Sequence, residues 1–282
     1  MKWGNLEVHP ISDGRIWLDG GAMFGVVPKP LWEKKVTPDG RNRIPLGLNC
    51  LLIQSGAENV LIDTGCGHKY SEKDLQIYRI EHQTNVAGEL ERLDLKPKDV
   101  DIVVNTHLHF DHCGGNTVRR GRAVVPTFPN ATYFVQRREY EDACRPNERT
   151  RATYLRENWE PIVESGRLHL VDGDEEIVPG LTAVPTPGHT LGHQSIKVRS
   201  GGRILFFIGD LCPTSAHVPL PWIMGYDLEP LTTLATRREI YRQAASEDWL
   251  LFFEHDPVLL CGRLRQEEGK YVLQPESWAD HL

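Results

Sequence analysis

Thr106-His107-Leu108-His109-Phe110-Asp111-His112 is the stretch on which the fold and the chemistry of this chain depend. It follows the apolar run Ile102-Val103-Val104, which is typical of a buried strand, and precedes Gly114-Gly115. His107 and His109 are two residues apart, so in an extended chain both side chains point the same way and can hold one ion. Asp111 and His112 then turn toward a second ion. The alternative is a loop whose histidines only form hydrogen bonds, but four ligand-type residues at this spacing favour metal.

Two ions need more ligands than this loop carries, and three further candidates end apolar segments downstream. They are His189 after Val184-Pro185-Thr186-Pro187-Gly188, Asp210 after the run 204–209, and His255 after the run 250–254. Rigid scaffolds present reactive groups where buried strands emerge. Taken singly, Asp210 could cap a turn and His189 could bind a loop carbonyl. Together with the first loop, the three residues can complete two ligand shells.

This pattern resembles the H-x-H-x-D-H loop and the downstream ligands of the metallo-β-lactamase superfamily, with matching elements from about Ile11 to His255. The resemblance implies two divalent metal ions, zinc foremost, although nitrogen and oxygen shells also accept iron, manganese or cobalt. It also implies a hydroxide between the ions as the nucleophile, and Asp111 and Asp210 as carboxylates that fix it and take up a proton. The implied ligands are His107, His109 and His189 for one ion, Asp111, His112 and His255 for the other, and Asp210 as the bridge.

The order of expected elements favours an α+β chain, an αββα sandwich of two mixed sheets flanked by helices, as one domain over residues 1–282. Residues 20–47 should form a long loop that covers the metal cleft or packs on a second subunit, with both readings open. Asp63-Thr64-Gly65 resembles the strand-ending D-T-G of the family, so Asp63 should support the metal loop from behind. His193 should be structural. Other expected elements are a hairpin over 6–19 turning at Asp13-Gly14, a hairpin joining 49–54 to 60–63, strands 101–105, 131–135, 168–171 and 181–185, helices 85–93, 137–144, 149–164 and 230–245, and a closing hairpin after His255.

Composition narrows the class of protein. The chain has 282 residues, 40% hydrophobic and 25% charged, and a net charge of −7 without a block of like charges, which argues against nucleic acid as a partner. No apolar run is long enough for a bilayer, and the first residues lack the apolar region of a signal peptide, so we expect a cytoplasmic protein without a membrane partner. The six cysteines show no C-x-x-C and should be buried thiols.

Single positions at which this chain differs from other branches of the superfamily indicate which branch it resembles. Asp210 disfavours zinc β-lactamases that bridge through cysteine, and His109 disfavours the flavin-dependent diiron proteins, which carry glutamate there. Glyoxalase II enzymes append a helical region for which the segment after His255 is too short. The remaining pattern resembles N-acyl homoserine lactonases and organophosphate hydrolases. A β-lactamase, a thioesterase-type hydrolase, a redox diiron protein and a non-catalytic metal-binding module remain as alternatives.

Lactonases of the best-known type have a tyrosine three residues after the bridging aspartate, where this chain has Pro213. Either Tyr226 or His217 replaces that tyrosine, or the leaving group needs no acid. The segment 219–226 carries Trp222 and Met224, and the loop 20–47 carries Phe24 and Trp32. These four residues are expected to form an apolar wall for an uncharged lipophilic ester, lactone or phosphotriester, with a homodimer interface as the alternative use.

Overall fold

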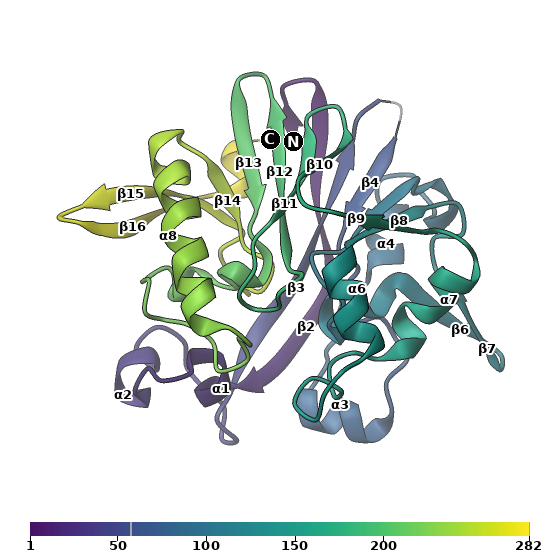
Figure 1. Cartoon of the computed structure of the whole chain (residues 1–282), viewed down its shortest axis with the longest axis horizontal. Helices are drawn as coiled ribbons and strands as arrows, with labels where there is room; N and C mark the ends of the chain where they lie inside the picture. The colour runs from purple at the N-terminus through teal and green to yellow at the C-terminus, as the bar shows by residue number, and fades with distance from the viewer. Residues whose placement is uncertain (57, 282) are drawn as a thin grey trace.

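The computed structural model describes residues 1–56 and 58–281, and shows two seven-stranded sheets packed face to face with helices on both outer sides (Figure 1). The first sheet is antiparallel from β1 to β4 and parallel from β4 through β5 and β8 to β9. Its strands in spatial order are β1 (Lys2–Trp3), β2 (Leu6–Asp19), β3 (Arg43–Gln54), β4 (Asn59–Ile62), β5 (Ile102–Val104), β8 (Thr132–Gln136) and β9 (Leu168–Val171).

The second sheet is antiparallel except for the parallel pair β13–β14. Its strands in spatial order are β10 (Glu175–Val178), β11 (Leu181–Pro185), β12 (Gln194–Ser200), β13 (Arg203–Phe207), β14 (Leu250–Phe252), β15 (Cys261–Glu267) and β16 (Lys270–Glu276). A separate ribbon consists of β6 (Thr117–Arg120) and β7 (Ala123–Pro126). The expected closing hairpin after His255 is therefore confirmed as β15–β16.

The helices are mostly short. They are α1 (Gly20–Phe24), α2 (Lys29–Trp32), α3 (Glu72–Tyr78), α4 (Val86–Glu91), α5 (Phe110–Cys113), α6 (Arg137–Cys144), α7 (Glu160–Glu164) and α8 (Pro230–Ser246). Single 3₁₀ turns occur at η1 (Pro97–Asp99), η2 (Gly114–Asn116), η3 (Arg156–Asn158), η4 (Gly209–Leu211), η5 (Ser215–His217) and η6 (Trp278–His281).

Both faces of the central strands are buried, which explains why those strands are continuous apolar runs in the sequence. Alternate residues such as Val60, Phe207 and Phe252 meet in the core between the two sheets. The other faces pack outward, with Phe206 against α8 and Val103 against α4 and α7. Figure 1 shows α8 beside the second sheet and α4, α6 and α7 beside the first. The expected αββα sandwich is confirmed.

The expected hairpin over residues 6–19 is wrong, because β2 runs through Asp13-Gly14 as one strand. Ser12 pairs with Asn49 whereas Arg15 pairs with Gly47, so the register shifts between them. Gly14 has a φ of +100°, and a Cβ there would lie 2.2 Å from a backbone oxygen. A β-bulge, not a turn, is therefore the reason for the glycine at this position.

Two other expected elements differ from the structure. Residues 20–47 contain α1, α2 and the start of β3 instead of one long loop. The expected helix over 149–164 is only η3 and α7, because the Asn147 side chain accepts bonds from the backbone of Arg149 and Thr150 and holds a turn there. Short loops and buried turns of this kind leave no helical period in the sequence.

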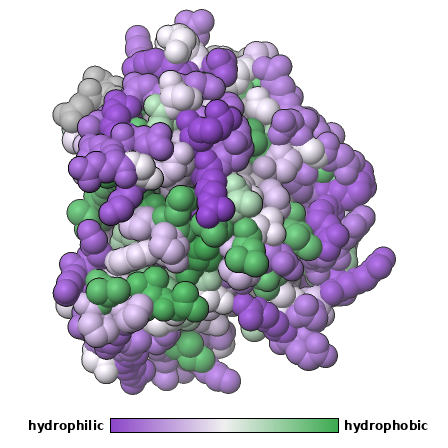
Figure 2. All heavy atoms as spheres, turned by 60° about the vertical axis from the view of Figure 1, so that its left-hand side comes forward, coloured by the Kyte–Doolittle hydropathy of each residue, from purple (hydrophilic) through white to green (hydrophobic). Residues whose placement is uncertain are grey.

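The surface of the molecule has apolar areas as well as charged ones. Among the described residues, none of the helices combines the length and the apolar character that crossing a membrane requires. Figure 2, which brings the side with α2 forward, shows apolar residues across the lower and central part of that face. On the segment 20–47, Val26 is 93% exposed and Leu31 is 49% exposed. Among the described residues no disulfide joins the six cysteines; five of them are buried, as expected, and Cys144 is half-buried. A homodimer, a cytoplasmic location and a single domain over 1–282 stay predictions.

Candidate metal centre

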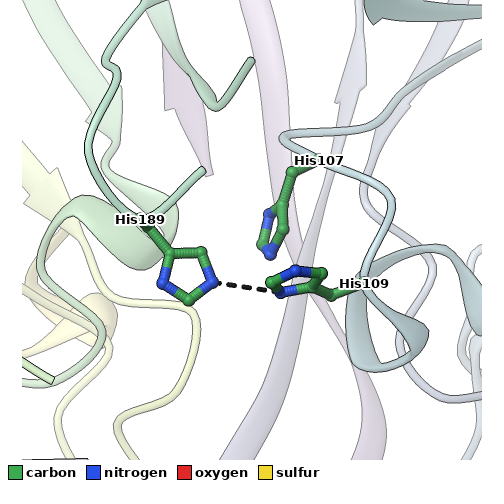
Figure 3. A group of neighbouring side chains, drawn as sticks. All are labelled: His107, His109 and His189. Atoms are coloured by element: carbon green, nitrogen blue, oxygen red, sulfur yellow. Dashed lines mark hydrogen bonds between the residues drawn. The ribbon is translucent and has the colours of Figure 1, made fainter. Parts of the chain in front are cut away.

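The candidate ligands come from the ends of strands in both sheets. The loop after β5 carries His107, and His109 begins α5, which contains Asp111 and His112. From the second sheet, His189 follows β11, Asp210 lies in η4 after β13, and His255 follows β14. The structure brings all seven side chains together, and each is at most 8% exposed. Figure 3 shows the imidazoles of His107, His109 and His189 converging from the two sheets.

Asp210 lies between two groups of ligands. Its Oδ2 is 3.1 Å from Nε2 of His189, 3.4 Å from Nε2 of His112 and 3.8 Å from Nε2 of His107. Its Oδ1 is 3.3 Å from Nε2 of His255. The groups that could hold an ion include His107–His109–His189, His107–His112–Asp210 and Asp111–His112–His255. A carboxylate whose oxygens lie within 4 Å of imidazoles from both groups has the position of a bridging ligand.

The hydrogen bonds of the imidazoles test whether this donor set fits a metal. Nδ1 of His255 lies 2.8 Å from the carbonyl oxygen of Gly47, and Nδ1 of His112 lies 3.0 Å from a carboxylate oxygen of Glu254. Oxygens of these kinds accept, so both Nδ1 atoms carry hydrogen and both Nε2 atoms present lone pairs. These Nε2 atoms lie 3.1 Å apart. Only a cation, a proton or a metal ion, can lie between them.

On the other side of Asp210, Nδ1 of His189 donates to Asp227, and Nε2 of His189 forms a hydrogen bond of 3.1 Å with Nδ1 of His109 (Figure 3). Among the described residues, Nε2 of His107 and Oδ1 of Asp210 are buried without a hydrogen-bond partner. Buried polar atoms are normally satisfied, so these orphaned groups fit residues whose partner is a bound ion.

The electrostatics of Asp210, His107 and His109 agree with this reading, whereas nearby carboxylates outweigh burial and raise the pKa values of His112 and His189, so these two imidazoles favour a proton where no metal ion is bound. Burial raises the pKa of Asp210, but neighbouring imidazoles, that of His189 foremost, outweigh burial and hold the pKa well below the ordinary carboxyl value. Burial and the adjacent imidazoles keep the pKa values of His107 and His109 well below that of free histidine. Asp210 is therefore an anion and these two imidazoles are neutral, which are the forms that bind metals.

Asp63 supports the metal loop from behind, as its D-T-G motif suggests. Its carboxylate accepts from the backbone nitrogen of Thr106 at 2.8 Å and from the Thr106 hydroxyl at 2.6 Å. The same carboxylate lies 3.2 Å from Nδ1 of His112. Asp63 has a φ of 53°, a conformation that costs energy outside glycine and is often kept at functional sites. This contact fixes the orientation of the His112 ring.

His193 has the structural role expected of it. Its Nε2 accepts from the backbone nitrogen of Asp210 at 3.1 Å, and its Nδ1 faces the carbonyl oxygen of Thr186. Gly209 has a φ of +55°, and a Cβ there would lie 2.9 Å from Nε2 of His193. The glycine therefore allows His193 to hold the turn that presents Asp210.

A cavity of about 330 Å³ opens onto the ligands. His109, Asp111, His189, Asp210 and His255 line its metal side. The rest of the wall is mostly apolar, with polar groups from Arg149, Thr150 and Thr153. The apolar part is formed by Leu18, Met23, Leu46, Tyr78, Phe110, Ala152, Met224, Gly225, Tyr226 and Leu228.

Of the four expected substrate residues, Met224 lines the cavity, whereas the expectation is wrong for Phe24, Trp32 and Trp222, which do not line it. Tyr226, the expected proton donor, also lies on the wall. Phe24 is fully buried, with ring centroids 5.2 Å from Trp32 and 5.7 Å from Trp222, because these aromatic rings pack on one another behind the wall. Met23 takes the place that the sequence suggested for its neighbour Phe24.

His217 is not available to replace the missing tyrosine. It is fully buried, its Nε2 faces the carbonyl oxygen of Met23 at 2.9 Å, and its Nδ1 faces the hydroxyl of Thr214 at 2.7 Å. Its ring stacks on Phe24 with a centroid distance of 4.5 Å. His217 is thus a packing residue, and Tyr226 is left as the candidate.

Several residues near the centre have no distinguishing mark in the sequence. Asp227 lies 3.0 Å from Nδ1 of His189, and Glu254 lies beside His112. Glu139 accepts from the hydroxyl of Tyr154, whose ring is 5.0 Å from that of His109. A lone acidic residue after a turn or on a helix looks like an ordinary surface charge. The only available signal is position, since Asp227 directly follows Tyr226 and Glu254 directly precedes His255.

Comparisons with known proteins agree with the geometry. The model of the metallo-beta-lactamase superfamily matches residues 43–261. An N-acyl homoserine lactonase of Bacillus cereus is 27% identical over 277 residues, which cover 93% of this chain and 95% of the relative. A probable metal-dependent hydrolase from Staphylococcus aureus, known from its crystal structure, is 34% identical with a TM-score of 0.89, covering 97% of this chain and 99% of its own.

A more distant structure shares the fold. AidC, a dizinc quorum-quenching lactonase in complex with a product, is 21% identical with a TM-score of 0.83, and the match covers 99% of this chain and 97% of that one. The family match spans most of the present chain, including all seven candidate ligands. This chain belongs to the metallo-β-lactamase superfamily, among its metal-dependent hydrolases.

Proposed function

We propose that this protein uses two divalent metal ions to hydrolyse an uncharged ester, lactone or phosphotriester. The observation that carries the proposal is the pair of ligand groups that meet at Asp210 on the floor of a mostly apolar cavity. Lactones are the first class to test, because the relative of Bacillus cereus is an N-acyl homoserine lactonase. A β-lactamase, a thioesterase and a redox protein are the alternatives.

One ion would be held by His107, His109 and His189 and the other by Asp111, His112 and His255, with Asp210 between them. Zinc suits this set of nitrogen and oxygen ligands, and iron, manganese or cobalt could replace it according to supply. When bound, the ions supply a nucleophilic water near neutral pH and neutralise charge on the attacked oxygen.

Asp111 and Asp210 are the groups that would orient the attacking water and accept its proton. Asp111 and Asp210 both line the cavity, and Asp210 is held by its backbone nitrogen on His193. A carboxylate whose pKa lies low is a weak base, so Asp210 is suited to orienting the water. Their position on the cavity wall supports both roles.

Tyr226 would donate a proton to the leaving oxygen. Burial raises the pKa of Tyr226 above that of a free phenol, so the hydroxyl stays protonated and remains a donor at neutral pH. Pro213, at the position of the usual tyrosine, has no such group. Tyr226 lies in the segment after η5, so the proton donor would come from a position 13 residues beyond Pro213.

The apolar wall suits a lipophilic acyl or aryl group. Leu18, Met23, Leu46 and Leu228 offer no charge, and Arg149 is the one cationic side chain among the lining residues. Nη2 of Arg149 donates to the backbone oxygens of Gly225 and Asp227. Because Arg149 binds these carbonyls, it fixes the segment that carries Tyr226.

Metal analysis followed by an activity panel tests the proposal. Purified protein should carry at least two equivalents of a divalent ion and hydrolyse at least one member of a panel of N-acyl homoserine lactones, aryl esters and phosphotriesters. Activity should disappear on chelation and return with the metal. Two bound ions without hydrolysis of any of these substrates, but with β-lactam cleavage, thioester cleavage or oxygen consumption, would instead support one of the alternatives.

A further inference from the structure

A second group of metal-ligand side chains lies outside the centre described above. One ligand atom from each of Asp13, His68 and His82 lies within 4.8 Å of the others. None of the three is a ligand candidate of the centre at Asp210, and none lines the cavity. They come from the bulge of β2, the loop after β4 and the segment between α3 and α4.

His82 has the hydrogen-bond pattern of a metal ligand. Its Nδ1 lies 2.8 Å from the backbone oxygen of Asp13, and because a carbonyl can only accept, this nitrogen carries the hydrogen. The Nε2 atom therefore presents a lone pair. Among the described residues, Nε2 of His82 is buried and has no hydrogen-bond partner. A histidine that donates through one nitrogen to a carbonyl and leaves the other without a partner has the hydrogen-bond pattern common to ligating imidazoles.

Asp13 supplies an anion that lacks a full counter-charge. It is 2% exposed, and its Oδ2 accepts from the backbone nitrogen of Gly67 at 2.8 Å. Burial raises the pKa of Asp13 to about 6, and the nearby His82 only partly offsets this rise. Among the described residues, no lysine or arginine forms an ion pair with Asp13. A buried carboxylate is costly unless a cation pairs with it.

His68 makes the group accessible. Its ring centroid lies 4.0 Å from that of His82, with the planes inclined by 40°. His68 is an exposed residue, so an ion could enter from solvent and keep water in a remaining position. Two imidazole nitrogens and one carboxylate oxygen are a donor set that zinc and similar ions prefer over calcium or magnesium.

We propose that Asp13, His68 and His82 form a third metal site, for a divalent transition ion such as Zn²⁺, separate from the centre at Asp210. The rival account is that the two rings merely pack on each other and on Asp13.

The position of the site gives the ion a role. His68 and His82 flank the segment that contains α3, a helix with no buried residue. The same segment carries Tyr78 on the cavity wall. An ion bound by His68 and His82 at the two ends of this segment, and by Asp13 at the β2 bulge, would close the segment into a loop, as a disulfide does. The third ion would therefore hold Tyr78 against the cavity without taking part in the reaction.

Counting metal in matched variants tests the site. The full-length protein is stripped by a chelator, reloaded with Zn²⁺, freed of excess metal and analysed for zinc per chain. We expect His68→Ala to hold one equivalent less than the wild type, and calorimetric titration should show that equivalent binding at least about 100-fold more weakly, since loss of a ligand should exceed loss of an outer hydrogen bond. His169→Ala is the control, because His169 is also exposed and its side chain contacts Glu175 and Phe134, which are not part of this group.

The comparison is a difference between variants, so it does not depend on the activity proposed above or on how many ions the main centre holds. His68 is exposed, so its replacement should not disturb folding. The second variant is His82→Asn, whose side-chain amide can still donate to the backbone oxygen of Asp13. Zinc should also protect the α3 segment from limited proteolysis in the wild type and not in either variant. Equal zinc content in the wild type and His68→Ala, or equal protection in both, would overturn the third site. Loss of the equivalent in His169→Ala would also overturn it.

Discussion

The Nε2 atoms of His112 and His255 face each other at 3.1 Å, and each ring already donates its other nitrogen to an oxygen acceptor. Two lone pairs at this distance repel unless a cation lies between them. The folded state therefore favours the binding of a cation between the two rings. The backbone oxygen of Gly47 fixes the ring of His255, and the carboxylate of Glu254 fixes the ring of His112.

Metal removal should consequently destabilise the protein. A ligand that binds only the folded state stabilises it by about 2.7 kcal/mol when present at 100 times its dissociation constant. We expect chelation to lower Tm by several degrees and zinc to restore it, as measured by thermal denaturation at constant protein concentration. The same Tm before and after complete removal of metal would contradict the role of the two rings as ligands.

Asp210→Asn should retain the fold and lose most of its activity. The backbone nitrogen of Asp210 would still bind His193, but a neutral amide cannot balance two ions. We expect kcat to fall at least about 100-fold, more than the loss of an outer hydrogen bond causes. Circular dichroism and metal content accompany the kinetics. Asp172→Asn, which alters an exposed aspartate paired with Arg137, is the control. Wild-type kcat with two bound ions would remove Asp210 from the bridge.

Asp227 should act through His189. Without the Asp227 carboxylate, Nδ1 of His189 has no hydrogen-bond acceptor, and the imidazole ring is no longer held in one orientation. We expect Asp227→Ala to weaken metal binding about 10- to 100-fold, measured by competition with a chromophoric chelator. Asp227→Asn keeps an acceptor oxygen and should restore part of the affinity. If the alanine and asparagine variants bind metal equally well, the hydrogen bond to His189 has no such role.

Tyr226→Phe should slow substrates according to their leaving group. General acid catalysis contributes about 100-fold or more where the departing oxygen is basic, so alkyl lactones should lose that much kcat and activated aryl esters little. Tyr271→Phe, a tyrosine on β16 away from the cavity, is the control. An equal loss for both substrate classes would show that Tyr226 only packs.

The same phenol predicts a feature of the pH profile. Burial raises the pKa of Tyr226, and the proton donor is the form present below that pKa. Ionisation of Tyr226 should therefore cause no fall in kcat between pH 8 and about 10, the pKa of a free tyrosine. A fall in that range that disappears in Tyr226→Phe would show that its pKa is not raised.

Met224→Ala should weaken the binding of long substrates. Met224 is on the cavity wall, so its loss removes contacts that the ground state and the transition state share. We expect KM to rise more for long acyl chains than for short ones, with little change in kcat. Leu220→Ala is the control, because Leu220 packs between the second sheet and α8. An equal rise in KM for all chain lengths would place the acyl chain elsewhere.

The sequence predicted best what depends on local spacing. His107 and His109 at a strand end, and apolar runs such as 204–208, are determined by neighbours a few residues away, so their position in the fold could be inferred. Gly14 was misread because a turn glycine and a bulge glycine look the same without the partner strand. The conformation of Gly14 depends on Asn49 and Gly47, which are far away in the chain.

The direction of side chains in irregular segments is the second feature that the sequence does not predict. Met23 and Phe24 are adjacent apolar residues, and only packing on Trp32 and His217 decides that Met23 turns to the cavity and Phe24 away from it. Asp227 could not be recognised, because its partner His189 lies in another loop. Such choices follow from tertiary contacts that leave no period in the sequence.

The two ligand groups each draw on both sheets, with His107 and His109 meeting His189, and Asp111 and His112 meeting His255. During synthesis, a chain that has emerged only as far as β9 carries the entire histidine loop and still lacks a complete set for either ion. Full coordination of the proposed ions must wait until β14, which precedes His255, has docked. Uptake of the proposed pair of ions would therefore be a late step in the maturation of this protein, and its presence would mark a chain whose two sheets have assembled.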